Sequence, residues 1–386
     1  MRDGKIVVLQ VIGGLSMGGA ESRIMDIARH IDRSKFDFDF LLDEPEGYYE
    51  PEAKKLGSNI YRVPRFRLYN WPQYASAMKK FFSEHKEIDI VHGSLTSTAS
   101  IYMPIAKKCG VPVTMAYARS AGVDPGPKGT VTKMLRKNLW KKCDHAAAVS
   151  SEAGEAVFGK ERLHHGDVMI MPGAMPLDKF CYAEHEAEGK AIREKFGLGD
   201  SFVIGHVGRF HYAKNHEFLI EVFKEIKKKK TDAKLLLAGN GPTFEAVKKK
   251  AADEGVSDDV VFAGETGNPA PMYMAADMLI FPSHYEGLPG TVIEAQAAGL
   301  PCLISDAISR EAAVTELVER FSLDKSAAEW ADEALKLFGT IKDRYPLRQD
   351  INMNPALSDA GFEIVSSTKK LEALFEKLLK DANGRD

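Results

Sequence analysis

The sequence predicts an α/β protein of two domains, each of the nucleotide-binding type with a parallel sheet. Its 386 residues exceed what one ordinary hydrophobic core holds and are typical of two domains. Short apolar runs alternate with helix-like segments, a pattern typical of a parallel sheet covered by helices. The pattern fades after residue 177 and begins again at residue 202. We therefore expect one domain over residues 1–178, a second over 179–357, and a cleft between them.

Apolar runs mark the expected strands in both halves. They cover residues 5–12, 36–42, 88–92, 111–115, 146–150 and 168–171, and then 202–207, 234–238, 260–263, 278–282 and 301–305. The stretch 177–200 is polar, and we expect it to be irregular. A last helical pattern runs over residues 366–379.

The composition, with 44% hydrophobic and 28% charged residues, is that of a soluble globular protein. No apolar run reaches the roughly 18 residues needed to cross a bilayer, and the N-terminus enters a strand pattern without a secretory leader. We therefore expect a cytoplasmic protein. Its four cysteines lie far apart without a C-x-x-C pair, which argues against a zinc site and against a disulfide framework.

The two halves of the chain differ in charge. Residues 1–180 carry 26 Lys and Arg against 21 Asp and Glu, a net of +5, and residues 181–386 carry 26 against 34, a net of −8. So modest a basic excess is typical of a solvated surface, or of a face toward an anionic acceptor. We expect no nucleic-acid partner.

The segment 283–301, SHYEGLPGTVIEAQAAGLP, is the most informative. A strand feeds a loop that holds Glu286, and the helix that follows ends at Gly299 with Pro301 beyond it. Glu294 lies inside this helix among apolar residues, so we expect it to be buried. A buried carboxylate needs hydrogen-bond partners. It either accepts hydroxyl protons from a ligand, or pairs with an internal arginine or a backbone group.

The start of the same helix can hold a phosphate. The amides of Leu288, Gly290 and Thr291 lie there, where N–H groups without intrahelical partners and the positive end of the helix dipole favour anions. Pro289 has no N–H, which leaves a gap in this cradle.

A second motif, GHVGRFHYAKNH at residues 205–216, follows the first strand of the second half. Its glycines let backbone approach closely, and Arg209 and Lys214 lie in the loop that opens the next helix. Arginine as a planar fork and lysine as a point charge can together clamp a diphosphate. Cations in loops are usually solvated, so this motif alone is a weak sign of a diphosphate site. Together with Glu286 and Glu294 it becomes a strong one.

A third motif, GGLSMGGAE at residues 13–21, forms a glycine-rich turn before an amphipathic helix. Its spacing differs from G-x-G-x-x-G, and no acidic residue ends a second strand where a ribose would need it, so a NAD site is disfavoured. The bare amides fit contact with an anion or an acceptor better.

Two weaker candidates lie in the first half. Asp37 and Asp39 form a D-x-D pattern that could hold a divalent ion, but strict alternation there indicates a half-exposed strand, and we expect no metal site. His92 ends a strand at the edge where open α/β sheets bind ligands. It fits a cleft residue and a structural histidine equally well.

A basic segment at residues 133–142 suggests a membrane contact. Apolar Leu135, Leu139 and Trp140 are surrounded there by Lys133, Arg136, Lys137, Lys141 and Lys142. A helix with this pattern could lie on an anionic membrane as a peripheral contact. An ordinary surface helix explains the pattern as well.

The spacing of Glu286 and Glu294, followed by A-x-A-A-G-x-P, resembles the family 4 glycosyltransferases of the GT-B fold. The motifs at residues 13–21 and 205–216 and the position of His92 agree in order and separation, so the resemblance covers nearly the whole chain. More narrowly, the chain is similar to bacterial capsule and exopolysaccharide transferases. The resemblance implies two Rossmann-like domains with parallel sheets facing across a cleft.

The same resemblance implies a reaction and a set of site residues. A sugar would move, with retention of its anomeric configuration and without metal or other cofactor, from a nucleotide diphosphate sugar such as a UDP-sugar. The acceptor would be a glycan or a lipid-linked glycan of a cell-surface polysaccharide. The implied catalytic residues are Glu286, Arg209, Lys214 and His92. The implied donor-binding residues are Glu294, Gly287, Leu288, Gly290, Thr291, Gly208 and Glu265, and the implied acceptor or phosphate loop comprises Gly18, Gly19, Tyr117 and Arg119.

By this resemblance Glu286 contacts the sugar hydroxyls and Glu294 the ribose hydroxyls, while the C-terminal segment 358–386 crosses back to the first domain. One departure concerns the residues after the strand at 111–115. Relatives often place there a histidine that reaches the C6 hydroxyl of the donor, whereas this chain has Tyr117 and then Arg119. How the C6 group is held is therefore open.

Two other functions stay possible on this scaffold. Related GT-B enzymes catalyse phosphorolysis and sugar epimerisation, so the fold alone does not fix the reaction. A nucleotide-sugar epimerase or hydrolase would act without an acceptor. A non-catalytic nucleotide-sugar binding protein is the other alternative, and the intact pair Glu286 and Glu294 argues against it.

Overall fold

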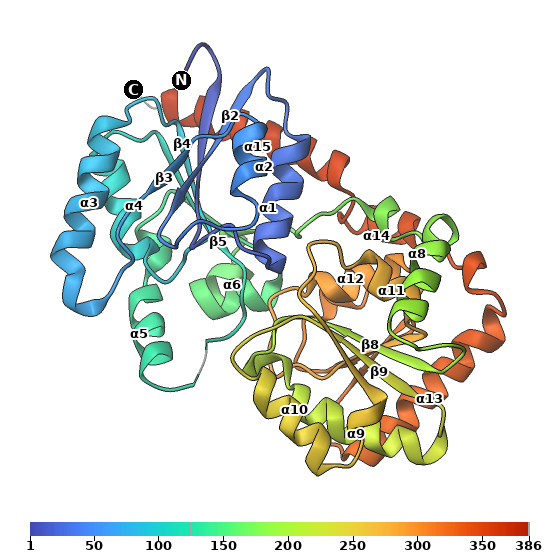
Figure 1. Ribbon diagram of the computed structural model, residues 1–386. Helices are drawn as coiled ribbons and strands as arrows, with labels where there is room; N and C mark the ends of the chain where they lie inside the picture. The colour runs from blue at the N-terminus through green and yellow to red at the C-terminus, as the bar shows by residue number, and fades with distance from the viewer. Residues whose placement is uncertain (124, 385–386) are drawn as a thin grey trace. The chain divides into compact units, whose positions relative to one another are not determined.

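The computed structural model describes residues 1–123 and 125–384, which fall into two compact α/β units. Unit 1 comprises Met1–Met175 and Ile364–Asp386, and unit 2 comprises Pro176–Glu363. Each unit is built on one sheet whose paired strands run parallel (Figure 1). The predicted α/β class with two parallel sheets is therefore confirmed.

Unit 1 holds a seven-stranded sheet in the order β3-β2-β1-β4-β5-β6-β7. Its strands are β1 (Ile6–Val11), β2 (Phe36–Leu42), β3 (Ile60–Arg62), β4 (Ile90–Gly93), β5 (Val113–Ala118), β6 (His145–Ala148) and β7 (Val168–Ile170). Its helices are α1 (Gly19–His30), α2 (Glu50–Lys55), α3 (Trp71–Glu84), α4 (Ala99–Lys108), α5 (Pro127–Arg136), α6 (Ser151–Phe158), α7 (Lys160–His164) and α15 (Ile364–Asn383), with 3₁₀ turns η1 (Leu68–Asn70) and η2 (Leu139–Lys141).

Unit 2 holds a six-stranded sheet in the order β10-β9-β8-β11-β12-β13. Its strands are β8 (Val203–Val207), β9 (Lys234–Ala238), β10 (Val260–Gly264), β11 (Met278–Phe281), β12 (Cys302–Ser305) and β13 (Val318–Phe321). Its helices are α8 (Tyr182–Lys195), α9 (His216–Lys229), α10 (Phe244–Asp253), α11 (Ala270–Ala275), α12 (Gly290–Ala297), α13 (Ala327–Arg344) and α14 (Asn354–Asp359). Its 3₁₀ turns are η3 (Leu177–Phe180), η4 (Tyr212–Lys214), η5 (Ser257–Asp259), η6 (Arg310–Ala312) and η7 (Arg348–Asp350).

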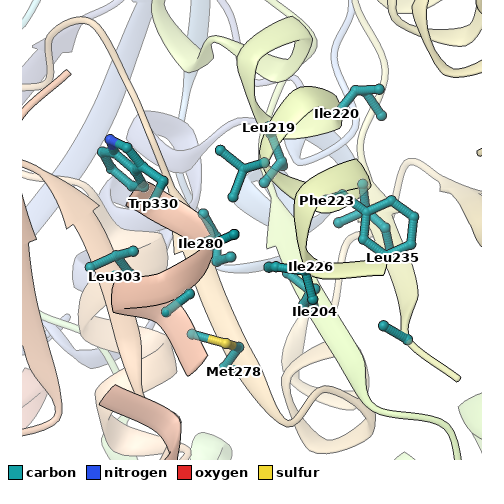
Figure 2. Close-up of a cluster of buried hydrophobic side chains, with 14 of the residues drawn as sticks. Ile204, Leu219, Ile220, Phe223, Ile226, Leu235, Met278, Ile280, Leu303 and Trp330 are labelled. Atoms are coloured by element: carbon teal, nitrogen blue, oxygen red, sulfur yellow. The ribbon is translucent and has the colours of Figure 1, made fainter. Parts of the chain in front are cut away.

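One face of the second sheet is covered by α9 and α13. The apolar stripe of α9, with Leu219, Phe223 and Ile226, is fully buried in the same cluster as Ile280 of β11 and Trp330 of α13 (Figure 2). Burial of each such side chain stabilises the fold by about 1.5–3 kcal/mol. This core holds β8 and β11 through Ile204 and Ile280, and the loops that follow these two strands carry the motifs of the second half.

The stretch 177–200 is not irregular, which corrects the prediction from its polar composition. It contains α8, which packs on α11. A Cβ on Gly189 would lie 2.6 Å from the carbonyl carbon of Met274, so the backbones of the two helices approach this closely only because a glycine stands there. Since Gly189 is the one buried residue of α8, the helix shows no apolar stripe by which it could be recognised.

The C-terminal helix α15 belongs to unit 1, where it packs on α1. The ring of Phe375 lies 6.4 Å from that of Phe36 and 5.9 Å from that of His92, between ring centroids. Glu372 accepts a hydrogen bond of 2.7 Å from the backbone N–H of Asp32. A buried aromatic contact and a polar contact thus tie the end of the chain to the first sheet.

The basic segment 133–142 is not one amphipathic helix, contrary to the premise of the membrane prediction. Helix α5 ends at Arg136, and Asn138 takes a left-handed conformation with φ 57° before η2 begins. Leu135 and Leu139 are 7% and 0% exposed, so the apolar side chains face the interior of unit 1. The guanidinium of Arg162 covers Trp140 at 3.6 Å from the ring centroid.

The D-x-D pattern lies on β2, but the strand is not half-exposed as predicted, because Asp39 is only 1% exposed. Arg2 Nη1 donates to Asp39 at 2.9 Å and to Asp37 at 3.1 Å. Asn59 donates to Asp39 through its backbone N–H at 2.9 Å. The two carboxylates are therefore engaged in structural contacts.

Candidate functional site

The strand order of unit 2 brings two distant sequence motifs together. The sheet reverses its order between β8 and β11, because β9 lies on one side of this pair and β12 on the other. Loops that leave neighbouring strands in opposite directions open a crevice at the carboxyl ends of the strands. These loops are residues 208–215 and 282–289, and the N–H of His284 donates to the carbonyl of Ala213 at 2.8 Å.

Lys214 and Glu286 form an ion pair between these two loops. Lys214 Nζ lies 2.6 Å from Glu286 Oε1, and the two side chains are 18% and 16% exposed. The ammonium also lies 4.6 Å from the ring centroid of Phe281, at the end of β11, a distance at which a cation is attracted by the ring face. The structure thus places a cation and a carboxylate side by side at the crevice.

Arg209 does not join this pair. Its side chain is exposed, and no residue in the described ranges forms an ion pair with it. Gly208 beside it packs against Lys214 instead, since a Cβ there would lie 3.4 Å from Lys214 Cε. The two side chains expected to bind the diphosphate therefore differ. Lys214 is paired in the crevice, whereas Arg209 is directed to solvent.

Two glycines that sequence analysis missed shape the same loop. A Cβ on Gly239 would lie 2.1 Å from the carbonyl oxygen of Gly208, and one on Gly241 would lie 2.3 Å from that of Phe210. Both also have positive φ, 141° and 155°, which side chains disfavour. The G-N-G sequence after β9 was the available sign that backbone approaches backbone here.

Helix α12 holds the remaining members of the candidate set in unit 2. Gly290 is its first residue, and Thr291 Oγ1 donates to the carbonyl of Val207 at 3.1 Å, which ties the helix start to the end of β8. Glu294 is 7% exposed and accepts a hydrogen bond of 2.7 Å from the hydroxyl of Tyr273. Tyr273 lies in α11, outside every motif, and sequence analysis had no sign of it.

The other residues expected to bind the sugar donor lie in two separate places. Gly287 is buried and Leu288 is partly exposed, both between Glu286 and the start of α12. Glu265 is exposed and follows the edge strand β10. Because β9 lies between β10 and β8, the backbone at Glu265 is about 10 Å from the loop that carries Lys214.

His92 of unit 1 is a buried residue in this structure. It is 3% exposed, its Nδ1 lies 2.8 Å from Gln10 Oε1, and its ring lies 5.1 Å from that of Tyr117. Burial, with a contribution from the charge of Arg119, lowers the pKa of His92 to about 3. The ring is therefore neutral at pH 7, and it lies 5.9 Å from the ring of Phe375, between centroids.

The glycine-rich turn leads into α1, with Gly18 as the residue before the helix and Gly19 as its first residue. A Cβ on Gly18 would lie 2.2 Å from Glu21 Oε2. The carboxylate of Glu21 thus lies against this helix end, where an external anion was expected. An anionic ligand would have to compete with it for the positive end of the helix dipole.

Tyr117 and Arg119 lie at the end of β5 and just beyond it. The Tyr117 hydroxyl donates to the carbonyl of Met171 at 2.6 Å, and the residue is 5% exposed. The Arg119 guanidinium lies 5.5 Å from the Tyr117 ring centroid, and burial lowers its pKa. Tyr117 therefore serves the contact between β5 and the residues after β7.

Comparison with known proteins agrees with this arrangement. Residues 17–179 match the model of Glycosyltransferase Family 4, and residues 189–354 match that of Glycosyl transferases group 1. The chain is 32% identical over 333 residues to EpsF of Bacillus subtilis (strain 168), described as a candidate glycosyltransferase, with 84% of this chain and 86% of EpsF covered. The chain belongs to glycosyltransferase family 4. This glycosyltransferase is also 23% identical to the capsular polysaccharide biosynthesis glycosyltransferase CapH of Staphylococcus aureus, over 96% of this chain and 98% of CapH.

Solved structures confirm the predicted GT-B fold for this glycosyltransferase. HepE of Anabaena, crystallised with UDP-glucose, superposes with a TM-score of 0.77 at 13% identity, covering 96% of this chain and 100% of HepE. WaaG, a glycosyltransferase involved in lipopolysaccharide biosynthesis, superposes with a TM-score of 0.73 at 17% identity, covering 96% of this chain and 99% of WaaG. The predicted enzyme class, a glycosyltransferase of the hexosyltransferase type, is confirmed by the family and its relatives.

Proposed function

We propose that this glycosyltransferase moves a sugar from a UDP-sugar, with retention, to a glycan or lipid-linked acceptor in cell-surface polysaccharide synthesis. The observation that carries the proposal is the Lys214–Glu286 pair at 2.6 Å, in the crevice between β8 and β11. A cation for a diphosphate and a carboxylate for sugar hydroxyls are the two groups such a donor requires. The name of CapH and the UDP-glucose in the HepE crystal support the same donor and pathway.

Each side chain of the site has a role in this proposal. Lys214, together with Arg209, offsets the charge that develops on the leaving diphosphate. Glu286 accepts hydrogen bonds from the donor sugar, and Glu294, oriented by Tyr273, accepts them from the ribose. The amides at the start of α12 bind phosphate oxygens. Residues 179–357 are then the donor domain, and residues 1–178 the acceptor domain.

The proposed step needs no metal and no covalent enzyme intermediate. The bond from the anomeric carbon to the diphosphate oxygen breaks, and the acceptor oxygen bonds to the same face of that carbon. The acceptor's hydroxyl proton passes to the leaving phosphate. Lys214, Arg209 and the helix dipole supply the positive charge that a divalent ion would otherwise supply.

Activity should therefore persist in EDTA, and proton NMR of the first-formed product should show the anomeric configuration of the donor. The assay uses the full chain, a panel of UDP-sugars and a glycan acceptor, with an excess of Mg²⁺ as the matched condition. Complete loss of activity in EDTA would contradict the metal-independent step. An inverted anomer would contradict retention, and both outcomes would leave the family assignment intact.

We also propose that the enzyme is cytoplasmic and that the basic segment 133–142 holds it on the inner face of the membrane. Lys133, Lys137 and Lys141 are exposed, and Met134 is 61% exposed. Since the leucines of the segment are buried, the contact would be electrostatic, at about 1 kcal/mol for each cation near an anionic surface. Within the described ranges, no helix combines the length and apolar character that crossing a membrane requires.

The double substitution Lys133→Glu with Lys137→Glu should lower binding to vesicles that contain anionic lipid, because two attractive charges become repulsive. Wild-type binding should also fall steeply with salt. Sedimentation measures both effects, and the double change Lys248→Glu with Lys249→Glu, both exposed on α10 of unit 2, is the charge-matched control. Equal binding to neutral and anionic vesicles would refute the proposal without affecting the enzyme assignment.

A further inference from the structure

A buried histidine lies next to Lys214 with one ring nitrogen unpaired. His206, on β8, is 0% exposed, and its Nδ1 lies 3.0 Å from the carbonyl oxygen of Ile280. Because a carbonyl only accepts, Nδ1 carries the hydrogen, and Nε2 of the neutral ring is left as an acceptor. Nε2 is buried and has no hydrogen-bond partner among the described residues. A buried acceptor without a partner is unfavourable and calls for an explanation.

The unpaired Nε2 of His206 and the side chain of Lys214 both lie close to Gly208. A Cβ on Gly208 would lie 3.5 Å from His206 Nε2 and 3.4 Å from Lys214 Cε. The His206 ring stacks on Phe281 with centroids 4.9 Å apart, and the Lys214 ammonium lies 4.6 Å from the centroid of the same ring. Gly208 thus leaves His206 and Lys214 next to each other beside the crevice.

The ammonium of Lys214 has N–H groups that its ion pair with Glu286 does not use. An ammonium carries three N–H groups, and the hydrogen bond described for Lys214 goes to Glu286. Burial lowers the pKa of His206 to about 4; the hydrogen bond to Ile280 opposes this shift and the charge of Lys214 adds to it. The lone pair on Nε2 is therefore available at neutral pH.

We propose that His206 is a positioning residue for Lys214, whose ammonium donates to His206 Nε2 when a diphosphate draws it away from Glu286. The proposal rests on the proposed donor site. Binding of the donor then satisfies an acceptor that is unpaired in the free enzyme, which favours the diphosphate-bound position of the lysine. It also releases Glu286 to accept hydrogen bonds from the sugar.

His216 provides a matched control in the same cluster. It is 2% exposed, its ring lies 4.5 Å from that of His206, and it stacks on Phe210 with centroids 4.2 Å apart. Both its ring nitrogens are buried without a described partner. His216→Phe therefore removes the same ring atoms as His206→Phe from a histidine that is not among the nearest neighbours of Gly208.

Calorimetric titration of the full chain with UDP tests the proposal through a double-mutant cycle of His206→Phe and Lys214→Ala. His206→Phe should weaken UDP binding about tenfold, the effect of one hydrogen bond to a charged group, but should have no further effect in Lys214→Ala. His206→Gln, whose amide oxygen can take the place of Nε2, should bind UDP nearly as the wild type does. Thermal unfolding without ligand checks that each variant is folded.

Three results would overturn the inference: no weakening by His206→Phe, equal weakening with and without Lys214, or equal weakening by His216→Phe. The second would show that the ring acts through packing alone, because packing does not depend on the ammonium. Failure of the wild type to bind UDP would instead refute the proposed donor site, and it is seen before any variant is made.

Discussion

Lys214→Ala should lower turnover about 100- to 1,000-fold, the usual effect of removing one preorganised group that stabilises charge in a transition state. The lysine lies in the crevice with its ammonium 2.6 Å from Glu286 Oε1, so its charge is already beside the site before the donor binds and has only to shift from the carboxylate to the diphosphate. Without it, the charge on the leaving diphosphate would be offset by Arg209 and the start of α12 alone. Initial rates with a saturating UDP-sugar and acceptor measure the effect.

The control for this change is Lys248→Ala, an exposed lysine on α10, which should retain wild-type turnover. Because the two side chains are only 18% and 16% exposed, loss of the lysine leaves the Glu286 carboxylate without its cation and should also destabilise unit 2, so thermal unfolding of the variant is measured beside its turnover. Glu286→Gln should also reduce turnover, through weaker positioning of the sugar, without trapping a glycosyl-enzyme. Wild-type rates in Lys214→Ala would remove the ion pair from the proposed mechanism.

The central strands of both sheets could be predicted from the sequence because they are buried on both faces. Val7, Val8 and Leu9 of β1 are all 0% exposed, which produces the continuous apolar run that marks a parallel strand. The edge strands β3 and β13 were missed. They are short and partly exposed, so neither length nor apolar content distinguishes them from loops.

The pairing of Lys214 with Glu286 could be expected only from motif and fold together. The two residues are 72 positions apart, and they meet because β8 and β11 are neighbours at the point where the sheet reverses its order. Tyr273 and Gly239 could not be predicted in the same way. Tyr273 reaches Glu294 from a separate helix, and the need for Gly239 arises from the carbonyl of a loop elsewhere in the sequence.

The amphipathic helix expected over residues 133–142 shows the opposite limit of sequence reasoning. The spacing of apolar and basic residues over 133–142 is that of an amphipathic helix, but the pattern does not tell which side of such a helix is covered. In the structure the leucines complete the core of unit 1, and the helix breaks at Asn138. Amphipathic spacing is the ordinary mark of a helix that packs on its own domain.

One arginine that no motif contains joins the ends of helices α11 and α12 in unit 2. Arg348 Nε and Nη2 donate to the carbonyl of Ala298 at 2.9 and 2.7 Å, at the end of α12. Its Nη2 also donates to the backbone carbonyl of Tyr273 at 2.9 Å, and its Nη1 donates to the backbone carbonyl of Ala276 at 2.7 Å, at the end of α11. Carbonyls in the last turn of a helix have no intrahelical partner, and a cation there is also favoured by the helix dipole.

Arg348→Met should therefore lower the free energy of unfolding by about 3 kcal/mol, since hydrogen bonds to a charged group are lost and several carbonyls lose their donor. Burial lowers the pKa of Arg348 to about 10, so the guanidinium still carries its charge at pH 7. Urea unfolding of the full chain measures the change.

Arg344→Met is the matched control, because the Arg344 side chain is 59% exposed and its ion pair with Glu316 should contribute less than about 1 kcal/mol. Arg348→Lys should fall between the two, because it retains the charge but not the planar fork that reaches both helix ends. Since Tyr273 orients Glu294, Arg348→Met should also weaken binding of UDP, and equal stability of the two methionine variants would show that the guanidinium does not hold α11 and α12 together.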